Sequence, residues 1–444
     1  MVNKTLKIGF SILFTAFESY AQDSIYSKSN EEIEAITQEI RSTHGEDSLG
    51  KFYDAFIDYR RYQRAIKRLE TYRTSETLDS LQELDLSNCH LTEIPSFAYQ
   101  CINITSLDLS GNSILELPEE LNDLSKLKKI RLNQNVQSIN KIKVAKLTNV
   151  TELTLKSNEL RTVPRRVKRL KNLKLLDVSY NDFKRIPNRF KRFKHLNSLD
   201  ISRNEELKSD FKIAKKLKNL EALYASSMRW EQIPDDVYQM TNLNKLIVRE
   251  NEIKHIAPSI SQLSNLTELS FYKNELSELP VELFELKDLR ELDLFYNQLT
   301  EIPDEISNLT QMNSLFLAFN QISYLPESLG KMNLHQIYIH HNNLSSLPNS
   351  ISLLDSLNTI RFNYNQYTEF PPSLLSLKQL TFIDMSNNDI KIIPAELKGM
   401  DELEILSIDK FENSIDDKIH ADQNEEVLTV LYGKGVNVNF GDPE

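Results

Sequence analysis

The sequence predicts an α/β repeat solenoid, and three regularities of the chain lead to that prediction. The pattern L-x-x-L-x-L-x-x-N-x-L returns about every 23 residues, and self-similarity at such a period marks a solenoid rather than a globular core. Each copy contains a Leu-x-Leu segment, whose period of two is that of a half-buried strand. A proline occupies one shared slot in most copies, where its fixed φ and missing N–H suit a turn that leaves the strand.

Fourteen repeats can be followed along the chain, and a decayed fifteenth begins at Leu403. Thirteen of the fourteen intervals between starts are 22 or 23 residues, and the interval from Leu196 to Leu220 is 24. We therefore expect about 14–15 coils. The earlier repeats start at Leu81, Ile104, Leu127, Val150, Leu173, Leu196, Leu220, Leu243, Leu266, Leu289, Met312, Leu334, Leu357 and Leu380.

The ninth position of the repeat is an asparagine in most copies. A buried amide at that position can bond to the turn backbones of neighbouring coils, which satisfies buried polar groups. We therefore expect these asparagines to be structural and not to contact a ligand. They are Asn112, Asn158, Asn181, Asn251, Asn274, Asn297, Asn320, Asn342, Asn365 and Asn388.

The motif, followed by an apolar-Pro pair such as Ile302 and Pro303, resembles the leucine-rich-repeat superfamily over roughly residues 81–410. It is similar in style to the 23-residue class found in bacterial proteins and in Ras-associated intracellular repeat proteins. The resemblance implies a horseshoe with a parallel sheet on its concave face. It also implies protein binding far more often than catalysis.

The first 21 residues have the layout of a secretory signal peptide. Lys4 and Lys7 precede the apolar run 8–17, and small residues at 19 and 21 come before Gln22. The run is shorter than the roughly 20 residues that a transmembrane helix needs, so we expect no transmembrane segment. This interpretation predicts a secreted, periplasmic or cell-envelope protein. The alternative is an apolar helix that caps the solenoid of a cytoplasmic protein.

Both ends of the repeat array are predicted to be capped. Residues 22–80 contain helical patterns, including an aromatic stripe over 49–72, and predict a helical N-terminal cap. Residues 411–444 predict a C-terminal cap, in which a polar and acidic stretch is followed by residues 425–432 and a strand-like tail over 436–440. A cap is needed because the end of a solenoid exposes apolar core.

The fifth, seventh and eighth positions of each repeat should face outward on the concave side, with equivalent residues about 5 Å apart in adjacent coils. In repeats ten to thirteen, six of these twelve positions are Phe or Tyr, against 9% aromatic residues in the chain. Such a cluster resembles a protein-binding hot spot, whereas simple stacking along the ladder is the structural alternative. The predicted partner-binding residues are Tyr272, Phe295, Tyr296, Phe316, Phe319, Tyr338, His340, His341, Arg361 and Tyr364.

His340 and His341 are adjacent, so on a strand their side chains would diverge. That geometry argues against a metal site and favours contacts that depend on pH.

A second candidate surface is basic. The chain carries a net charge of −11, but residues 126–195 hold 21 Lys and Arg against four acids, which leaves −28 on the remainder. Such a polarised surface could meet an anionic polymer or glycan, lipid headgroups or an acidic protein, or it could be an ordinary solvated convex face. Nucleic acid is not expected, because no aromatic residues are interleaved there and the whole chain is acidic. The predicted basic patch comprises Arg165, Arg166, Lys168, Arg169, Arg189, Lys191, Arg192 and Lys194.

The sequence lacks the G-x-S-x-G, H-E-x-x-H, Walker and kinase signatures, so it predicts neither an enzyme nor a cofactor. The favoured function is a secreted or envelope-facing bacterial scaffold that binds a protein on its concave face. Two alternatives remain: an intracellular signalling scaffold or regulatory subunit, and an adhesin-like binder of glycan or anionic polymer.

Overall fold

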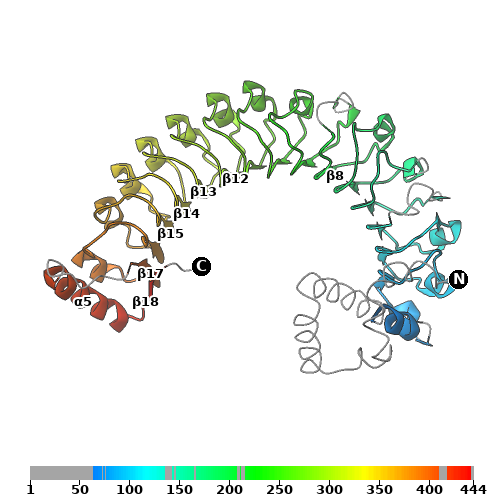
Figure 1. The fold of residues 1–444 in the computed structure, drawn as a ribbon, viewed down its shortest axis with the longest axis horizontal. Helices are drawn as coiled ribbons and strands as arrows, with labels where there is room; N and C mark the ends of the chain where they lie inside the picture. The colour runs from blue at the N-terminus through cyan, green and yellow to red at the C-terminus, as the bar shows by residue number, and fades with distance from the viewer. Residues whose placement is uncertain are drawn as a thin grey trace, which may run out of the picture.

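The computed structural model describes residues 64–72, 74–75, 77–135, 143–144, 147–164, 167–207, 211, 216–409 and 418–441. They form an open horseshoe, with short strands on the inner side and helical turns on the outer side (Figure 1). The predicted signal peptide, residues 1–21, and most of the predicted N-terminal cap lie outside the described residues. Residues 64–72 are helical, and Ala65 on this segment is buried.

Each of the fifteen predicted repeats contributes one strand to a single parallel sheet, and a strand from the C-terminal segment completes it. The predicted solenoid with a concave parallel sheet is therefore confirmed. Along the sheet the strands are β1 (Glu83–Asp85), β2 (Ser106–Asp108), β4 (Lys129–Arg131), β6 (Glu152–Thr154), β7 (Leu175–Asp177), β8 (Ser198–Asp200), β9 (Ala222–Tyr224), β10 (Lys245–Ile247), β11 (Glu268–Ser270), β12 (Glu291–Asp293), β13 (Ser314–Phe316), β14 (Gln336–Tyr338), β15 (Thr359–Arg361), β16 (Phe382–Asp384), β17 (Ile405–Ile408) and β18 (Asn437–Phe440). A separate pair joins β3 (Glu116–Leu117) to β5 (Lys143–Val144).

The core lies between the sheet and the convex turns and runs without interruption along the solenoid. In repeat ten, Leu289, Leu292 and Leu294 are buried, while Asp293 and Phe295 between and beside them face outward and are only half-buried. The period of two therefore sorts the side chains as predicted.

The asparagine ladder closes the backbone hydrogen bonds of the turns. The Asn297 Nδ2 donates to the carbonyl oxygens of Phe271 at 3.0 Å and Leu294 at 3.1 Å, and its Oδ1 accepts the Leu276 N–H at 3.1 Å. Asn135 and Asn204, which were not predicted, fill the same slot and are fully buried. The amides thus hold adjacent coils together, as expected of structural residues.

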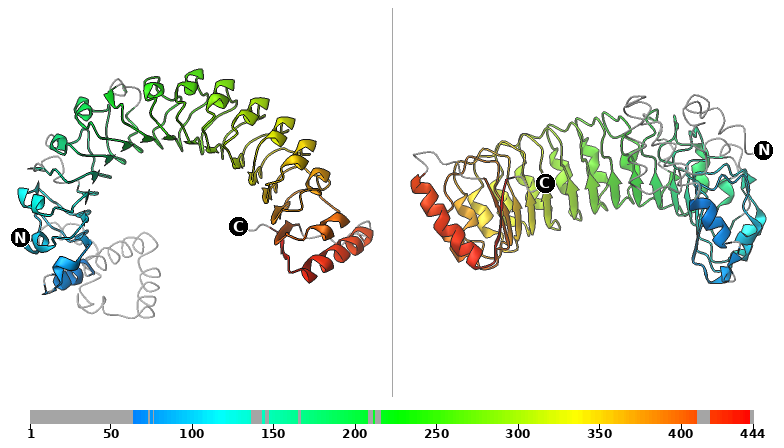
Figure 2. Two further views of the ribbon diagram at one scale, coloured as in Figure 1. Left: turned by 180° about the vertical axis from the view of Figure 1, so that it is seen from behind. Right: turned by 60° about the horizontal axis from the view of Figure 1, so that its bottom comes forward.

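The proline slot leads onto short 3-10 turns that cover the convex side (Figure 2). A typical turn begins after Pro280, whose backbone is extended, and its first bond runs from the Leu283 N–H to the Pro280 carbonyl at 3.0 Å. The turns are η2 (Leu78–Ser80), η3 (Ser96–Gln100), η4 (Glu119–Asp123), η6 (Val167–Arg169), η7 (Asn188–Arg192), η9 (Val237–Gln239), η10 (Pro258–Gln262), η11 (Val281–Glu285), η12 (Asp304–Asn308), η13 (Glu327–Lys331), η14 (Asn349–Leu353), η15 (Pro372–Leu374) and η16 (Ala395–Gly399).

The C-terminal end carries the helix α5 (Lys418–Gly433), which was not predicted, and then β18, which pairs in parallel with β17. Phe411, which stands where an asparagine is expected, lies outside the described residues. Two other side chains satisfy the last turns. Asp409 accepts the N–H groups of residues 387 and 388, and Asn424 of α5 accepts the Ile393 N–H at 2.8 Å.

Candidate functional site

The strand register brings the predicted concave residues together. Asp293 pairs with Phe316, Phe316 with Tyr338, and Tyr338 with Arg361 across four neighbouring strands. The seventh and eighth positions follow each strand end, so their side chains line the edge of the same sheet. The nine predicted rings form one connected set, which we call the aromatic patch: Tyr272, Phe295, Tyr296, Phe316, Phe319, Tyr338, His340, His341 and Tyr364.

The eighth position supplies a stacked column of rings. The centroids of Tyr296 and Phe319 are 4.0 Å apart, those of Phe319 and His341 are 3.9 Å apart, and those of His341 and Tyr364 are 4.0 Å apart. The interplanar angles are 10°, 17° and 23°. Tyr272 closes one end of the column with its edge toward Tyr296. Phe319 and His341, the inner rings of the column, therefore have a neighbour on each face and present mainly their edges to solvent.

The fifth and seventh positions supply a second cluster beside this column. Phe316 stacks on Tyr338 with centroids 5.3 Å apart, and Phe295 meets Phe316 edge to face at 5.6 Å. His340 joins the two sets, because its ring lies 5.7 Å from Phe295 and 5.4 Å from Phe319.

The rings shield one another, so the patch is less exposed than the sequence predicted. Tyr296 is 39% exposed, His340 is only 8% exposed, and the other seven are half-buried. The stacking alternative is thus part of the structure. The surface therefore carries a connected set of partly covered rings rather than separate exposed rings.

The prediction that the two imidazoles diverge is wrong. The strand ends at Tyr338, and His341 has a φ of +53°, so the two histidines do not follow the alternation of a strand. Their ring centroids lie 5.5 Å apart, and the angle between the ring planes is 73°.

Two arginine–aspartate pairs flank the aromatic patch. At one end Asp293 accepts the Ser270 hydroxyl at 2.8 Å and lies 3.5 Å from the Arg249 guanidinium. At the other end the Arg361 Nε and Nη2 donate to one Asp384 oxygen at 3.2 and 3.1 Å. Burial raises the pKa of Asp384, while hydrogen bonds from Ser386 and the charge of Arg361 oppose that rise.

Arg249 and Asp384 were not among the predicted site residues. Each lies one or two coils from its partner, so their roles depend on how coils stack. Both would have been found by reading the fifth and seventh positions of one or two further repeats on either side of the predicted set.

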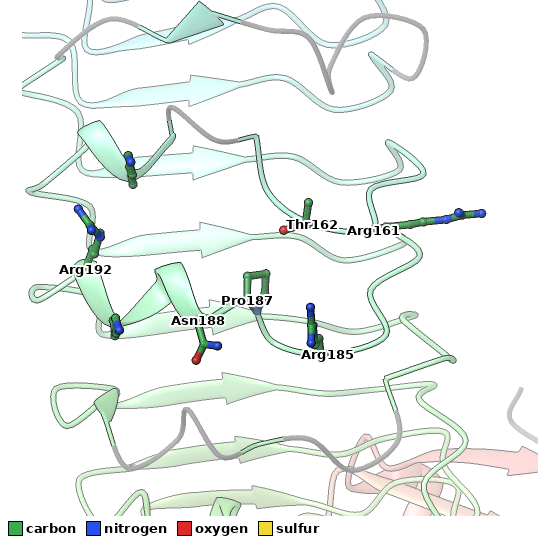
Figure 3. A pocket seen from close by; sticks show the side chains of 8 residues that line it. Arg161, Thr162, Arg185, Pro187, Asn188 and Arg192 are labelled. Atoms are coloured by element: carbon green, nitrogen blue, oxygen red, sulfur yellow. The ribbon is translucent and has the colours of Figure 1, made fainter.

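The basic residues lie around the convex side of the fourth and fifth repeats. A hollow of about 590 Å³ is lined by Arg161, Thr162, Lys168, Arg185, Pro187, Asn188, Lys191 and Arg192. Figure 3 shows Arg161 and Arg192 at opposite ends of this group, with Thr162, Pro187 and Arg185 between them. We call this feature the basic hollow.

Only part of the predicted basic patch belongs to the basic hollow. Lys168, Lys191 and Arg192 line it, whereas Arg169 and Lys194 are exposed outside its lining. Arg165 and Arg166 lie outside the described residues, as does the side chain of Arg189. Arg161 and Arg185 also line the hollow but were left out of the predicted patch, although both belong to the basic segment 126–195.

No helix in the described part of the chain is long and apolar enough to cross a membrane. Among the same residues, no three or more His, Cys, Asp or Glu side chains are grouped so as to hold a metal ion.

Four family models of leucine-rich repeats match the chain. A leucine-rich repeat region matches residues 134–275, two further repeat models match residues 264–322 and 79–123, and a single-repeat model matches residues 379–400. No curated protein matches the sequence.

Solved structures resemble the whole solenoid. A leucine-rich-repeat protein of Leptospira interrogans is 25% identical, with a TM-score of 0.66 over 84% of this chain and 98% of that one. An internalin of Listeria monocytogenes is 20% identical, with a TM-score of 0.55 over 78% of this chain and 89% of that one. Drosophila Toll, solved in complex with Spätzle, is 19% identical, with a TM-score of 0.57 over 72% of this chain and 49% of that one. The repeat motif, the parallel sheet and the four family models agree that this chain belongs to the leucine-rich-repeat superfamily.

Proposed function

We propose that this protein is a non-catalytic scaffold that binds a protein partner through the aromatic patch on its concave face. The observation that carries the proposal is the connected set of nine rings, flanked by the Arg249–Asp293 and Arg361–Asp384 pairs. An apolar centre with a polar rim is the usual anatomy of a protein interface, and aromatic residues and arginine dominate binding energy there.

The packing of the rings favours a protein partner over a sugar. A sugar binds an aromatic residue by lying on the face of its ring, but Phe319 and His341 have neighbours on both faces. The stacked rings instead present mainly their edges. Apolar side chains of a partner can pack against these edges and exclude water from them.

A capture experiment tests the patch. The chain beginning at Gln22 is used to capture partners from envelope and host extracts, and the captured protein is then purified and titrated. A variant with Phe295, Phe316, Tyr338 and Tyr364 changed to Ala should bind at least about tenfold more weakly, because each is placed as a hot-spot residue.

A matched control removes four exposed apolar side chains from outside the patch, namely Val281, Tyr324, Leu353 and Ile392. This control should bind like the unchanged chain. Equal affinities for all three proteins, with intact circular dichroism, would reject the concave patch as the binding site.

The proposed location is outside the cytoplasm, secreted or at the cell envelope. It rests on the layout of residues 1–21. Expression of the full chain followed by N-terminal sequencing should find Gln22 as the first residue in the periplasm or medium. An intact N-terminus recovered only from cytoplasm would favour the intracellular scaffold instead.

A further inference from the structure

The basic hollow is distinct from the aromatic patch in both place and chemistry. It lies between the fourth and fifth repeats on the convex side, whereas the patch lies on the concave side of repeats nine to thirteen. Five of its eight lining residues are cations, and none is an acid. A smaller hollow, which shares Arg161 and Thr162 with it, is lined by the two acids Glu159 and Asp182.

The repeat itself builds the basic hollow. Lys168 and Lys191 occupy the same position of successive repeats, 23 residues apart, as do Thr162 and Arg185. Stacking of the coils therefore sets like charges side by side, which costs free energy in the absence of an anion. In the part of the chain that the structure describes, none of the five lining cations forms an ion pair with a carboxylate, although the neighbouring Lys184 lies 3.9 Å from Glu206.

We propose that the basic hollow binds a polyanionic saccharide, one that carries sulfate or phosphate groups on its sugar rings. Guanidinium groups match the oxygens of sulfate and phosphate in a bidentate manner, and lysine adds compact charge. Thr162 and Asn188 supply uncharged donors and acceptors for sugar hydroxyls, and Pro187 supplies a small apolar surface. A volume of about 590 Å³ is in the range of small-ligand sites, so a few sugar units occupy it.

The surroundings of the basic hollow disfavour two other polyanions. Stable attachment to a lipid surface needs an apolar anchor beside the basic charge. Among the described residues of 126–195, the one exposed large apolar side chain is Tyr180, which lies under the cations of Lys156 and Arg203 and not in the hollow. Binding of single-stranded nucleic acid relies on rings that stack with bases, and no aromatic residue lines the hollow.

The experiment titrates the full chain with a heparin-derived hexasaccharide and with the same hexasaccharide after desulfation. The sulfated probe should bind, and desulfation should weaken binding at least about tenfold, because charge-assisted bonds to several sulfates are lost. A variant with Lys168, Arg185 and Lys191 changed to Gln should lose about tenfold or more of the affinity for the sulfated probe.

A matched variant separates a built site from diffuse charge. Changing Lys171, Lys174 and Lys194 to Gln removes the same charge from exposed positions of the same basic segment, outside the lining of the hollow. This variant should keep most of the affinity. Equal losses in the two variants would overturn the proposal and leave only non-specific attraction.

Two further arms identify the source of the negative charge. Vesicles of equimolar phosphatidylcholine and phosphatidylglycerol, and a single-stranded oligonucleotide, should bind more weakly than the sulfated hexasaccharide. Stronger binding of either one would replace the saccharide with a membrane or a nucleic acid. The aromatic-patch variant should bind the hexasaccharide like the unchanged chain, so failure of the concave-face proposal leaves this one testable.

Discussion

At the residue scale, the eighth position of the repeat has the most unusual backbone in the molecule. It adopts a positive φ in repeat after repeat, including +55° at Tyr296, +56° at Phe319 and +53° at Tyr364. A non-glycine residue with a Cβ pays about 1–2 kcal/mol for this conformation, and bulky residues seldom adopt it. Aromatic residues are therefore poor choices for the backbone here. Their stacking with one another, worth about 0.5–1.5 kcal/mol for each pair, offsets that cost.

This balance predicts that Phe319→Asn separates stability from binding. Asparagine adopts a positive φ more readily than phenylalanine, so relief of backbone strain should offset the two lost stacking contacts and the lost edge contact with His340. We expect the free energy of unfolding to change by less than about 1 kcal/mol, whereas affinity for the concave-face partner falls about tenfold or more. Chemical denaturation and titration measure the two quantities. Gln134→Asn, at the same backbone position outside the patch, is the control, and a large loss of stability in Phe319→Asn alone would show that stacking outweighs strain.

The ninth position is one where a single side chain satisfies several buried groups. Replacing Asn297 with Ala leaves the Leu276 N–H without its acceptor and removes one of the two amide donors to each of two carbonyls. The Phe271 carbonyl keeps Asn274, and the Leu294 carbonyl keeps Asn320. We expect a loss of at least about 2 kcal/mol in unfolding free energy, because unsatisfied buried polar groups are costly. Asn308→Ala, on the exposed part of η12, should change stability by no more than about 0.5 kcal/mol. Similar values for the two variants would contradict a structural role for the ladder.

The sequence predicted which residues face outward, but not how their rings pack, and the reason is physical. The ninth-position amides and the outward fifth, seventh and eighth positions follow from the place of a residue within one repeat, so the motif identifies them. The stack of His341 on Phe319 depends on the positive φ at the eighth position and on the distance between coils. The alternation of apolar and polar residues along a strand predicts neither of these. Predicting diverging histidines assumed that the strand continued beyond Tyr338.

At the element scale, the C-terminal cap shows how a solenoid ends without its consensus. Val427, Leu428 and Leu431 on α5 join the core, and β18 adds one more strand to the sheet. The sequence predicted the cap and its strand-like tail, but not the helix α5. It did not predict that Asp409 and Asn424 bond the last turns, since neither stands at the ninth position of a repeat.

Leu431→Ala tests whether this cap holds the end of the array. Leu431 is fully buried, so the change should cost about 2–5 kcal/mol. In a solenoid each repeat contacts mainly its neighbours, so the loss should appear first in the adjoining coils. Hydrogen exchange should speed up in β16, β17 and β18 and stay unchanged in β8 to β10. The control is Val430→Ala, at a position 36% exposed, and a uniform rise in exchange along the sheet would show that the array unfolds as a single unit.

At the scale of the whole molecule, an elongated shape lets a chain of net charge −11 carry a locally basic surface. At an ionic strength of about 0.15 M the Debye length is about 8 Å, so charges a few coils away are screened. The fifth and tenth repeats are separated by five strand spacings, about 24 Å along the sheet. The acidic remainder therefore does little to repel an anion from the basic hollow, and the two faces can act independently.

Independence of the two faces predicts different responses to salt. Raising the ionic strength from about 0.1 M to about 1 M shortens the Debye length from about 10 Å to about 3 Å. Affinity for the sulfated hexasaccharide should fall at least about tenfold, because charge carries that contact, while affinity for the concave-face partner should change at most a few-fold, because apolar burial carries that one. When the triple basic-hollow variant is combined with the quadruple aromatic-patch variant, each affinity should fall only as much as in the variant of its own face, because distant sites act independently. If salt weakened both affinities in parallel, or if the variant of one face weakened binding of the other ligand, the division into two faces would be wrong.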